Sequence, residues 1–220
     1  MAIIGTPSLL LPRAVLYCWQ HLWAHIVAWQ LRVICGIDHH IDGSPAKHQV
    51  IYAVKHQSAW EGIVLFAYLK SPVVVLKRSL LFLPIFGLYL LRSGVMAIDR
   101  RRGTSALTEI ITKSRRAVAK GRSLLIFPQG TRVAPHGHRR YHRGVYAIYA
   151  ECRLPVVPVA LNSGHFWGKG SHKNPGQIRV RILPAIAPGL TREVFMAKLE
   201  KILEDESQAL APATKPAKRR

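Results

Sequence analysis

Residues 50–62 are VIYAVKHQSAWEG, an apolar run followed by a histidine and a glutamate. The run 50–55 is apolar except for its last residue, which is typical of a buried strand. His56 follows it directly, and Glu61 lies five positions later. On one continuous helix these two side chains would point about 140° apart, because each residue turns the chain by roughly 100°. They can meet only if the chain bends, as it does at a strand-to-helix turn.

Short apolar runs alternate with helix-like runs on both sides of this stretch. The sequence predicts strands at 50–55, 72–76, 94–98, 123–127, 156–161 and 177–183. It predicts helices near 60–70, 80–91, 104–120, 142–152 and 191–209. Such alternation indicates an α/β fold with a largely parallel central sheet flanked by helices. A chain of 220 residues is long enough for one such domain with a substantial core.

The N-terminal segment 14–37 contains a single formal charge, Arg32. On a helical wheel His21, His25 and Arg32 fall in one narrow stripe, and three tryptophans lie on the opposite arc. This pattern is typical of a helix at a membrane interface, and the segment is also long enough to span a bilayer. A core helix of a soluble domain is the alternative. We expect an apolar, membrane-associated helix that lies in or dips into one leaflet.

These patterns divide the chain into three parts. Residues 1–38 form the N-terminal membrane-associated segment, 39–210 the α/β domain, and 211–220 a basic tail. The second part opens with HHIDGSPAKH, 39–48, which its composition predicts to be a polar linker.

The charge balance indicates which classes of partner the chain can attract. The formal net charge is +21, from 32 Lys and Arg against 11 Asp and Glu. Such an excess attracts polyanions, including nucleic acid, anionic lipid and acidic or phosphorylated molecules. The three cysteines form no CxxC pair and are typical of small buried residues in a reducing compartment. The histidines lack metal-binding spacings, so we expect no metal site.

Polar residues follow three of the predicted strands, where active sites of open α/β sheets gather. In the first, Glu61 can fix the tautomer of His56 and make it a general base, a role that contributes on the order of 10²–10⁴ in rate. Glu61 could equally serve as a favourable charge at a helix N-terminus. The spacing of these two residues leaves both interpretations open.

The other two segments carry arginines. In GVMAIDRRRG, 94–103, Asp99 precedes three arginines that form either a phosphate cradle or a solvated turn. In LLIFPQGTR, 124–132, Gly130 permits a tight turn beside Arg132, which indicates anion binding or a surface turn. The sequence contains no GxSxG, P-loop or GxGxxG motif that would support serine hydrolysis, phosphoryl transfer from a nucleotide or dinucleotide chemistry.

Four segments occur together in a known order. HQSAWE, GVMAIDR, FPQGTR and VVPVALN follow the order and rough spacing of the four motif blocks of the glycerolipid acyltransferases. The chain resembles, more narrowly, the bacterial 1-acyl-glycerol-3-phosphate acyltransferases, which make phosphatidic acid. The resemblance covers roughly residues 50–190.

The resemblance implies roles for individual residues. His56 would deprotonate the free sn-2 hydroxyl of lysophosphatidic acid, which then attacks an acyl thioester. Glu61 would orient His56 and balance its charge. Arg132 and Lys77 would bind the phosphate of the acceptor.

Further substrate-binding residues follow from the same resemblance. Arg100 belongs to the block that helps to bind the acceptor, and Gln129, Gly130 and Thr131 stand beside Arg132 in the third block. The apolar run 80–91 would line the path of the acyl chain. No metal, cofactor or covalent acyl-enzyme is implied, and the acyl donor is a co-substrate, either acyl-CoA or acyl carrier protein.

Two residues depart from the family pattern. The first block usually ends in Asp, and here Glu61 is one methylene longer. The third block usually has Glu where this chain has Gln129, which can donate a hydrogen bond but carries no charge. The loss of a negative charge beside the phosphate should ease anion binding. We expect Gln129→Glu to be tolerated.

The resemblance also predicts partners and location. An anionic acceptor, an anionic membrane surface and anionic donors account for the basic charge. The expected location is the bacterial inner membrane with the site facing the cytoplasm, without a nucleic-acid partner. One alternative is the same transfer to glycerol 3-phosphate or a lyso-aminolipid. Another, from a different class, is a basic nucleic-acid-binding protein.

Overall fold

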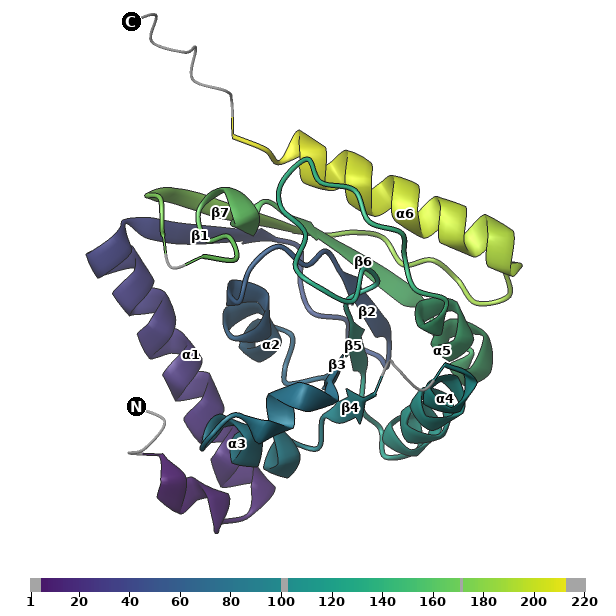
Figure 1. Ribbon diagram of the computed structural model, residues 1–220, viewed down its shortest axis with the longest axis horizontal. Helices are drawn as coiled ribbons and strands as arrows, with labels where there is room; N and C mark the ends of the chain where they lie inside the picture. Colours follow the sequence, from purple (N-terminus) through teal and green to yellow (C-terminus); the bar gives the residue numbers. More distant parts are fainter. Residues whose placement is uncertain (1–4, 100–102, 171, 213–220) are drawn as a thin grey trace, which may run out of the picture.

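A mostly parallel sheet forms the centre of the protein. The computed structural model describes residues 5–99, 103–170 and 172–212. Within these ranges seven strands pair in the order β1-β7-β6-β2-β5-β3-β4 (Figure 1). The strands are β1 (Ile37–Asp42), β2 (Ile51–Val54), β3 (Val73–Lys77), β4 (Met96–Ile98), β5 (Leu124–Ile126), β6 (Val156–Leu161) and β7 (Gly176–Ile182). Among these seven described strands, β6 and β7 are the one pair that runs antiparallel. The predicted α/β fold with a largely parallel sheet is confirmed.

Helices cover both faces of this sheet. They are α1 (Arg13–Cys35), α2 (Val64–Tyr68), α3 (Phe86–Ser93), α4 (Thr104–Ala119), α5 (Gly144–Cys152) and α6 (Arg192–Ala209). Short 3-10 turns are η1 (Thr6–Leu9), η2 (Trp60–Gly62), η3 (Arg78–Phe82) and η5 (Ser163–His165). The helix predicted over 60–70 is divided into η2 and α2. The helix predicted over 80–91 is divided into η3 and α3, because Pro84 cannot continue a helix interior.

The segment predicted to be a linker is partly a strand. Residues 37–42 form β1, which pairs in parallel with β7 from Ile37 opposite Gly176 to Asp42 opposite Arg181. The polar composition of β1 gave no strand signal in the sequence. This strand lies at the edge of the sheet, and Ile37 alone among its residues is fully buried. An edge strand contacts the sheet on one side only and therefore tolerates exposed polar side chains. The prediction of a linker over 39–42 was wrong.

Alternation along the strands separates two hydrophobic cores. On β2, Ile51 and Ala53 face the core covered by α4, α5 and α6. Tyr52 and Val54 face the opposite core, which is covered by α1 and α2, with α3 beside α1 (Figure 1). This two-residue period is the reason that an all-apolar strand is buried on both faces.

One face of helix α1 packs against the rest of the protein. It ends at Gly36, whose φ of 64° is the left-handed conformation common after a helix. Leu16, Ala24 and Leu31 are buried against the domain, and His21 hydrogen-bonds the Ser71 hydroxyl at 2.8 Å. None of the helices in the described ranges combines the length and the apolar character needed to cross a bilayer. The division at 1–38, 39–210 and 211–220 stays a prediction.

Candidate active site

The chain bends after β2 and brings the predicted pair together. His56 lies just beyond the strand, and η2 returns the chain so that His56 Nδ1 is 3.2 Å from Glu61 Oε2. Glu61 has no exposed surface, whereas 19% of the His56 side chain is exposed. The imidazole is therefore open to a ligand on one side and is held by a buried carboxylate on the other.

Two further groups fix the carboxylate of Glu61. The Ser58 backbone N–H donates to both of its oxygens, at 3.0 and 3.1 Å. The Ser163 hydroxyl, in η5, which is separated from β6 by one residue, donates to Glu61 Oε1. These donors hold the Glu61 carboxylate in place, where it can accept the Nδ1–H of His56. The other ring nitrogen, Nε2, is then left as a proton acceptor. Sequence reasoning missed Ser163, although it immediately follows the fourth motif block.

The FPQGTR segment packs against the same imidazole. The ring of Phe127 stacks on His56 with centroids 3.9 Å apart and planes inclined by 23°. The Val133 backbone N–H donates to the carbonyl oxygen of His56 at 2.8 Å. These contacts place Arg132, between Phe127 and Val133, near the base.

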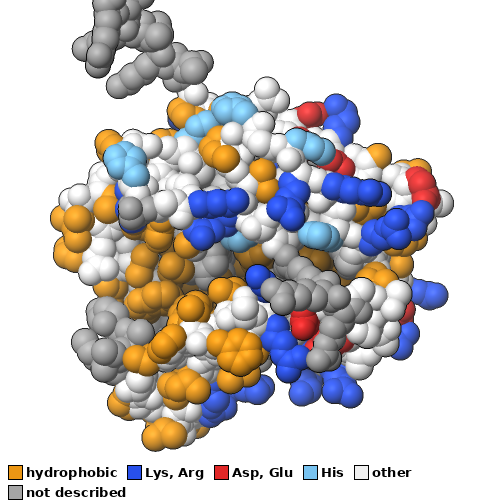
Figure 2. Space-filling view, viewed as in Figure 1, with side chains coloured by type: hydrophobic (Ala, Val, Ile, Leu, Met, Phe, Trp, Pro, Cys, Tyr) orange, Lys and Arg blue, Asp and Glu red, His pale blue; other side chains and the backbone are white. Residues whose placement is uncertain are grey.

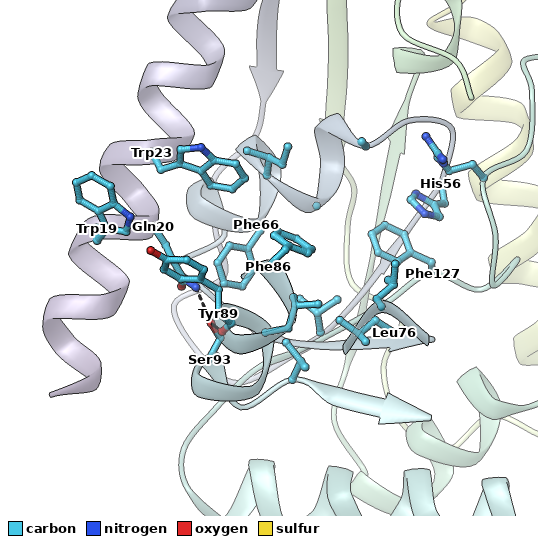
Figure 3. Close-up of a pocket in the computed structure, with 18 residues that line it drawn as sticks. Trp19, Gln20, Trp23, His56, Phe66, Leu76, Phe86, Tyr89, Ser93 and Phe127 are labelled. Carbon is cyan, nitrogen blue, oxygen red and sulfur yellow. Dashed lines mark hydrogen bonds between the residues drawn. The ribbon is translucent and has the colours of Figure 1, made fainter. Parts of the chain in front are cut away.

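An apolar cavity of about 330 Å³ opens beside His56. His56 and Phe127 lie on one side of it, and Trp19, Gln20 and Tyr89 lie on the opposite side (Figure 3). The wall is built by α1, α2, α3, η2, η3, β3 and the segments that follow β2 and β5. Its residues are Trp19, Gln20, Trp23, His56, Ala59, Gly62, Ile63, Phe66, Val74, Leu76, Leu80, Phe86, Tyr89, Leu90, Ser93, Val95, Phe127 and Arg132. The geometry suits a ligand with a long apolar part and an anionic group.

The structure gathers some of the predicted substrate-binding residues and separates others. Arg132 lines the cavity with His56, and four residues of the 80–91 run form part of the wall. Gly130 has a φ of 68°, as its predicted tight turn requires. Lys77 is exposed at the end of β3 and Thr131 is half-buried, and neither lines the cavity. Arg100 lies outside the described residues.

Gln129 does not face the cavity. Its side chain is 1% exposed, and its Nε2 donates to Glu204 Oε1 on α6 at 3.4 Å. The turn at Gly130 directs Gln129 toward α6 and Arg132 toward the cavity, so a role of Gln129 beside the acceptor phosphate stays a prediction that this placement does not support. Within residues 5–99, 103–170 and 172–212, no three His, Cys, Asp or Glu side chains gather as metal ligands would.

Comparisons with known proteins show the family to which the chain belongs. A family model described as Acyltransferase matches residues 37–162, more than half of the chain. The chain is 38% identical over 168 residues to a 1-acyl-sn-glycerol-3-phosphate acyltransferase of Pseudomonas aeruginosa, covering 74% of this chain and 65% of that protein. It is 29% identical to a protein of the same name from Cocos nucifera, covering 76% of this chain and 55% of the relative. The chain thus spans less than two thirds of each of these relatives.

The fold also has a counterpart among solved structures. It is similar to the crystal structure of a 1-acyl-sn-glycerophosphate acyltransferase from Thermotoga maritima, with a TM-score of 0.74 and 21% identity. The match covers 92% of this chain and 83% of that chain.

Proposed function

The chain belongs to the acyltransferase family, and we propose that it transfers a fatty acyl group from a thioester to the sn-2 hydroxyl of 1-acyl-glycerol 3-phosphate, giving phosphatidic acid. The observation that carries this proposal is the hydrogen bond between His56 Nδ1 and the buried Glu61, in the wall of an apolar cavity that Arg132 also lines. Base, anion-binding group and apolar space are what a lysophosphatidic acid acceptor and an acyl thioester require together.

The proposed reaction uses His56 twice. Its Nε2 takes the proton of the acceptor hydroxyl as the oxygen attacks the thioester carbonyl carbon. The new C–O bond forms, the C–S bond breaks, and the thiolate leaves with the proton that His56 returns. Glu61 keeps the imidazole in the required tautomer and stabilises the imidazolium between these steps. No covalent acyl-enzyme is needed.

Arg132 and the cavity would position the two substrates. A guanidinium matches the oxygens of a phosphate with two parallel hydrogen bonds, so Arg132 is assigned to the acceptor phosphate. The apolar wall from Leu80 to Leu90 is assigned to a fatty acyl chain. The donor is acyl-CoA or acyl carrier protein, whose negative charge suits a chain of net charge +21.

An exposed apolar surface supports docking to a membrane. Trp29 and Ile34 of α1 are 61% and 74% exposed, and Phe82 of η3 is 79% exposed. Figure 2 shows hydrophobic side chains gathered on the side of the molecule that carries α1 and α3. This surface borders the cavity, so a lipid would enter without crossing water. We assign the site to the cytoplasmic face of a bacterial inner membrane, where both thioester donors are made.

Acyl transfer to lysophosphatidic acid tests the proposal directly. The full chain in a detergent–lipid mixture is given labelled acyl-CoA or acyl carrier protein, and phosphatidic acid is measured. His56→Ala should lower kcat by roughly 10²–10⁴-fold, whereas the exposed His40→Ala on β1 should leave it unchanged. If product forms from glycerol 3-phosphate or a lyso-aminolipid and not from lysophosphatidic acid, the proposed acceptor is wrong and the alternative is the substrate. Unchanged turnover in His56→Ala would show that His56 is not the general base.

A further inference from the structure

A single carboxylate on α6 contacts the residue that directly precedes the base. Lys55 is only 2% exposed, and its Nζ lies 2.5 Å from each carboxylate oxygen of Glu204. A buried ammonium is strongly unfavourable without a negatively charged partner. Glu204, which is 149 residues away along the chain, supplies it.

The same carboxylate contacts the third motif block and the loop after it. Gln129 Nε2 donates to Glu204 Oε1 at 3.4 Å, and the Tyr141 hydroxyl donates to the same oxygen at 2.9 Å. Burial, and then the charge of Glu204, raise the pKa of Tyr141 far above its usual value, so this hydroxyl stays protonated and remains a donor. Glu204 therefore receives donors from segments that follow β2 and β5.

These two segments carry the proposed catalytic and phosphate-binding groups on their other side. Strands β2 and β5 are neighbours in the sheet, and α6 lies beside the loop that leaves β5 (Figure 1). His56 follows Lys55, and Arg132 follows Gln129 by three residues. Both line the cavity, whereas Lys55 and Gln129 face α6. Glu204 joins the two segments from behind.

We propose that Glu204 is a positioning residue that fixes the placement of His56 relative to Arg132. An acceptor held by its phosphate presents its hydroxyl to the base only if these two side chains keep their separation. Through Lys55 and Gln129, Glu204 holds the two loops that set this separation. The kinetic part of this inference rests on the proposed function.

The charge balance around Glu204 explains why position 129 carries an amide. Among the described side chains that contact Glu204, Lys55 brings one positive charge, so the pair is neutral. A carboxylate at 129 would add a second negative charge beside one ammonium and would lose the donor that now faces Glu204. The sequence-based expectation that Gln129→Glu is tolerated is therefore revised. Moving the charge with the double substitution Gln129→Glu, Glu204→Gln restores the balance.

The experiment compares this exchange with a matched control on the same helix. Glu206 also forms an ion pair, with its Oε2 at 2.5 Å from Arg181 Nη1, and its side chain is 32% exposed against 30% for Glu204. Its partner lies on β7, away from both motif segments. For Glu204→Gln, Gln129→Glu, the double variant and Glu206→Gln we would measure kcat, the KM for lysophosphatidic acid and the thermal midpoint. The ¹⁵N signal of the His56 ring, assigned by its loss in His56→Ala, gives a readout that does not need turnover.

The expected pattern separates positioning from general stability. Glu204→Gln and Gln129→Glu should each lower kcat/KM by roughly 10- to 100-fold, as expected when reacting groups are misplaced by about 1 Å. The double variant should recover most of this loss, and Glu206→Gln should keep wild-type kinetics even if its thermal midpoint falls equally. The His56 signal should shift in Glu204→Gln and not in Glu206→Gln.

Two results would overturn the inference. One is a Glu204→Gln variant whose kcat/KM and His56 signal match those of Glu206→Gln. The other is a double variant that recovers nothing relative to Gln129→Glu. If the wild type makes no phosphatidic acid, the proposed function fails, and the His56 signal alone decides the role of Glu204.

Discussion

The imidazole of His56 depends on a carboxylate that is itself held by neighbours. Glu61 is buried and accepts hydrogen bonds from the Ser58 backbone and the Ser163 hydroxyl while it contacts His56. Glu61 lies in η2, and from there its carboxylate oxygen reaches His56 Nδ1 at 3.2 Å. The orientation of the proposed base is thus decided by groups outside the His56–Glu61 pair.

Removing the Ser163 hydroxyl should weaken this support. We expect Ser163→Ala to lower kcat by roughly ten- to a hundredfold, because a hydrogen bond to a charged group contributes about 1.5–3 kcal/mol. The KM values should change little, since Ser163 does not line the cavity. Steady-state kinetics at saturating substrate give the measurement. Ser114→Ala is the control, because Ser114 is equally buried in α4 but bonds only the sulfur of Met96. Equal kcat in the two variants would exclude a role for Ser163.

Arg132 should act on binding more than on turnover. We expect Arg132→Ala to raise the KM for lysophosphatidic acid by roughly 10- to 100-fold, as the loss of a charge-assisted pair predicts. Arg132→Lys should fall between, because an ammonium keeps the charge and loses the bidentate geometry. Titration of the acceptor at fixed donor measures this, with the exposed Arg192→Ala as control. A KM that stays at the wild-type value would disprove the phosphate assignment.

At the scale of elements, the cavity depends on how closely η3 and α3 approach. A Cβ added at Gly87 would lie 1.9 Å from the carbonyl oxygen of Leu81, so the two segments touch through a glycine. Leu80 and Phe86, on either side of this contact, both line the cavity. The shape of the apolar wall therefore follows from one backbone contact.

Gly87→Ala should separate η3 from α3. We expect the thermal midpoint to fall by about 2–12 °C, since overpacking costs about 1–3 kcal/mol and each kcal/mol shifts the midpoint by about 2–4 °C in a chain of this size. Differential scanning calorimetry would measure the change. Gly144→Ala on α5 is the control, because its added Cβ would meet only Ile110 Cδ1 at an ordinary 3.8 Å. A fall of the same size in both variants would show that the contact with Leu81 is not responsible.

At the scale of the whole molecule, exposed apolar side chains are concentrated beside the cavity, while the chain as a whole is basic. Trp29 on α1 and Phe82 on η3 contribute to this surface. A membrane would bury such side chains, and anionic lipids would attract the surrounding Lys and Arg. The apolar part of this attachment should persist in high salt, unlike contacts with nucleic-acid phosphates.

Binding to anionic vesicles tests this arrangement. The double variant Trp29→Ser, Phe82→Ser should bind at least about tenfold more weakly, because burying one large apolar side chain contributes about 1.5–3 kcal/mol. Co-sedimentation in low and high salt measures the affinity. Val194→Ser is the control, because Val194 is 52% exposed on α6, which covers the opposite face of the sheet. Complete release of the wild type by salt, or an equal loss in the control, would reject the assigned surface.

The sequence by itself determined the fold class and predicted that His56 and Glu61 meet. Alternating apolar and helix-like runs are local patterns, and they predicted the six strands β2 to β7 and the order of the helices. The five-residue spacing of His56 and Glu61 required a bend, which the structure contains. The edge strand β1 escaped prediction because a strand that is half in solvent carries no apolar signature.

Only the tertiary structure decided which distant residues complete the site. Ser163 reaches Glu61 across 102 residues, and Glu204 reaches Lys55 across 149. These contacts exist because β6 lies next to β2 and α6 packs against that part of the sheet. Gln129 was assigned to the phosphate from its position in the motif, but the turn at Gly130 points it at α6 instead. A motif fixes the neighbours of a residue along the chain, whereas the order of strands in the sheet fixes its neighbours in space.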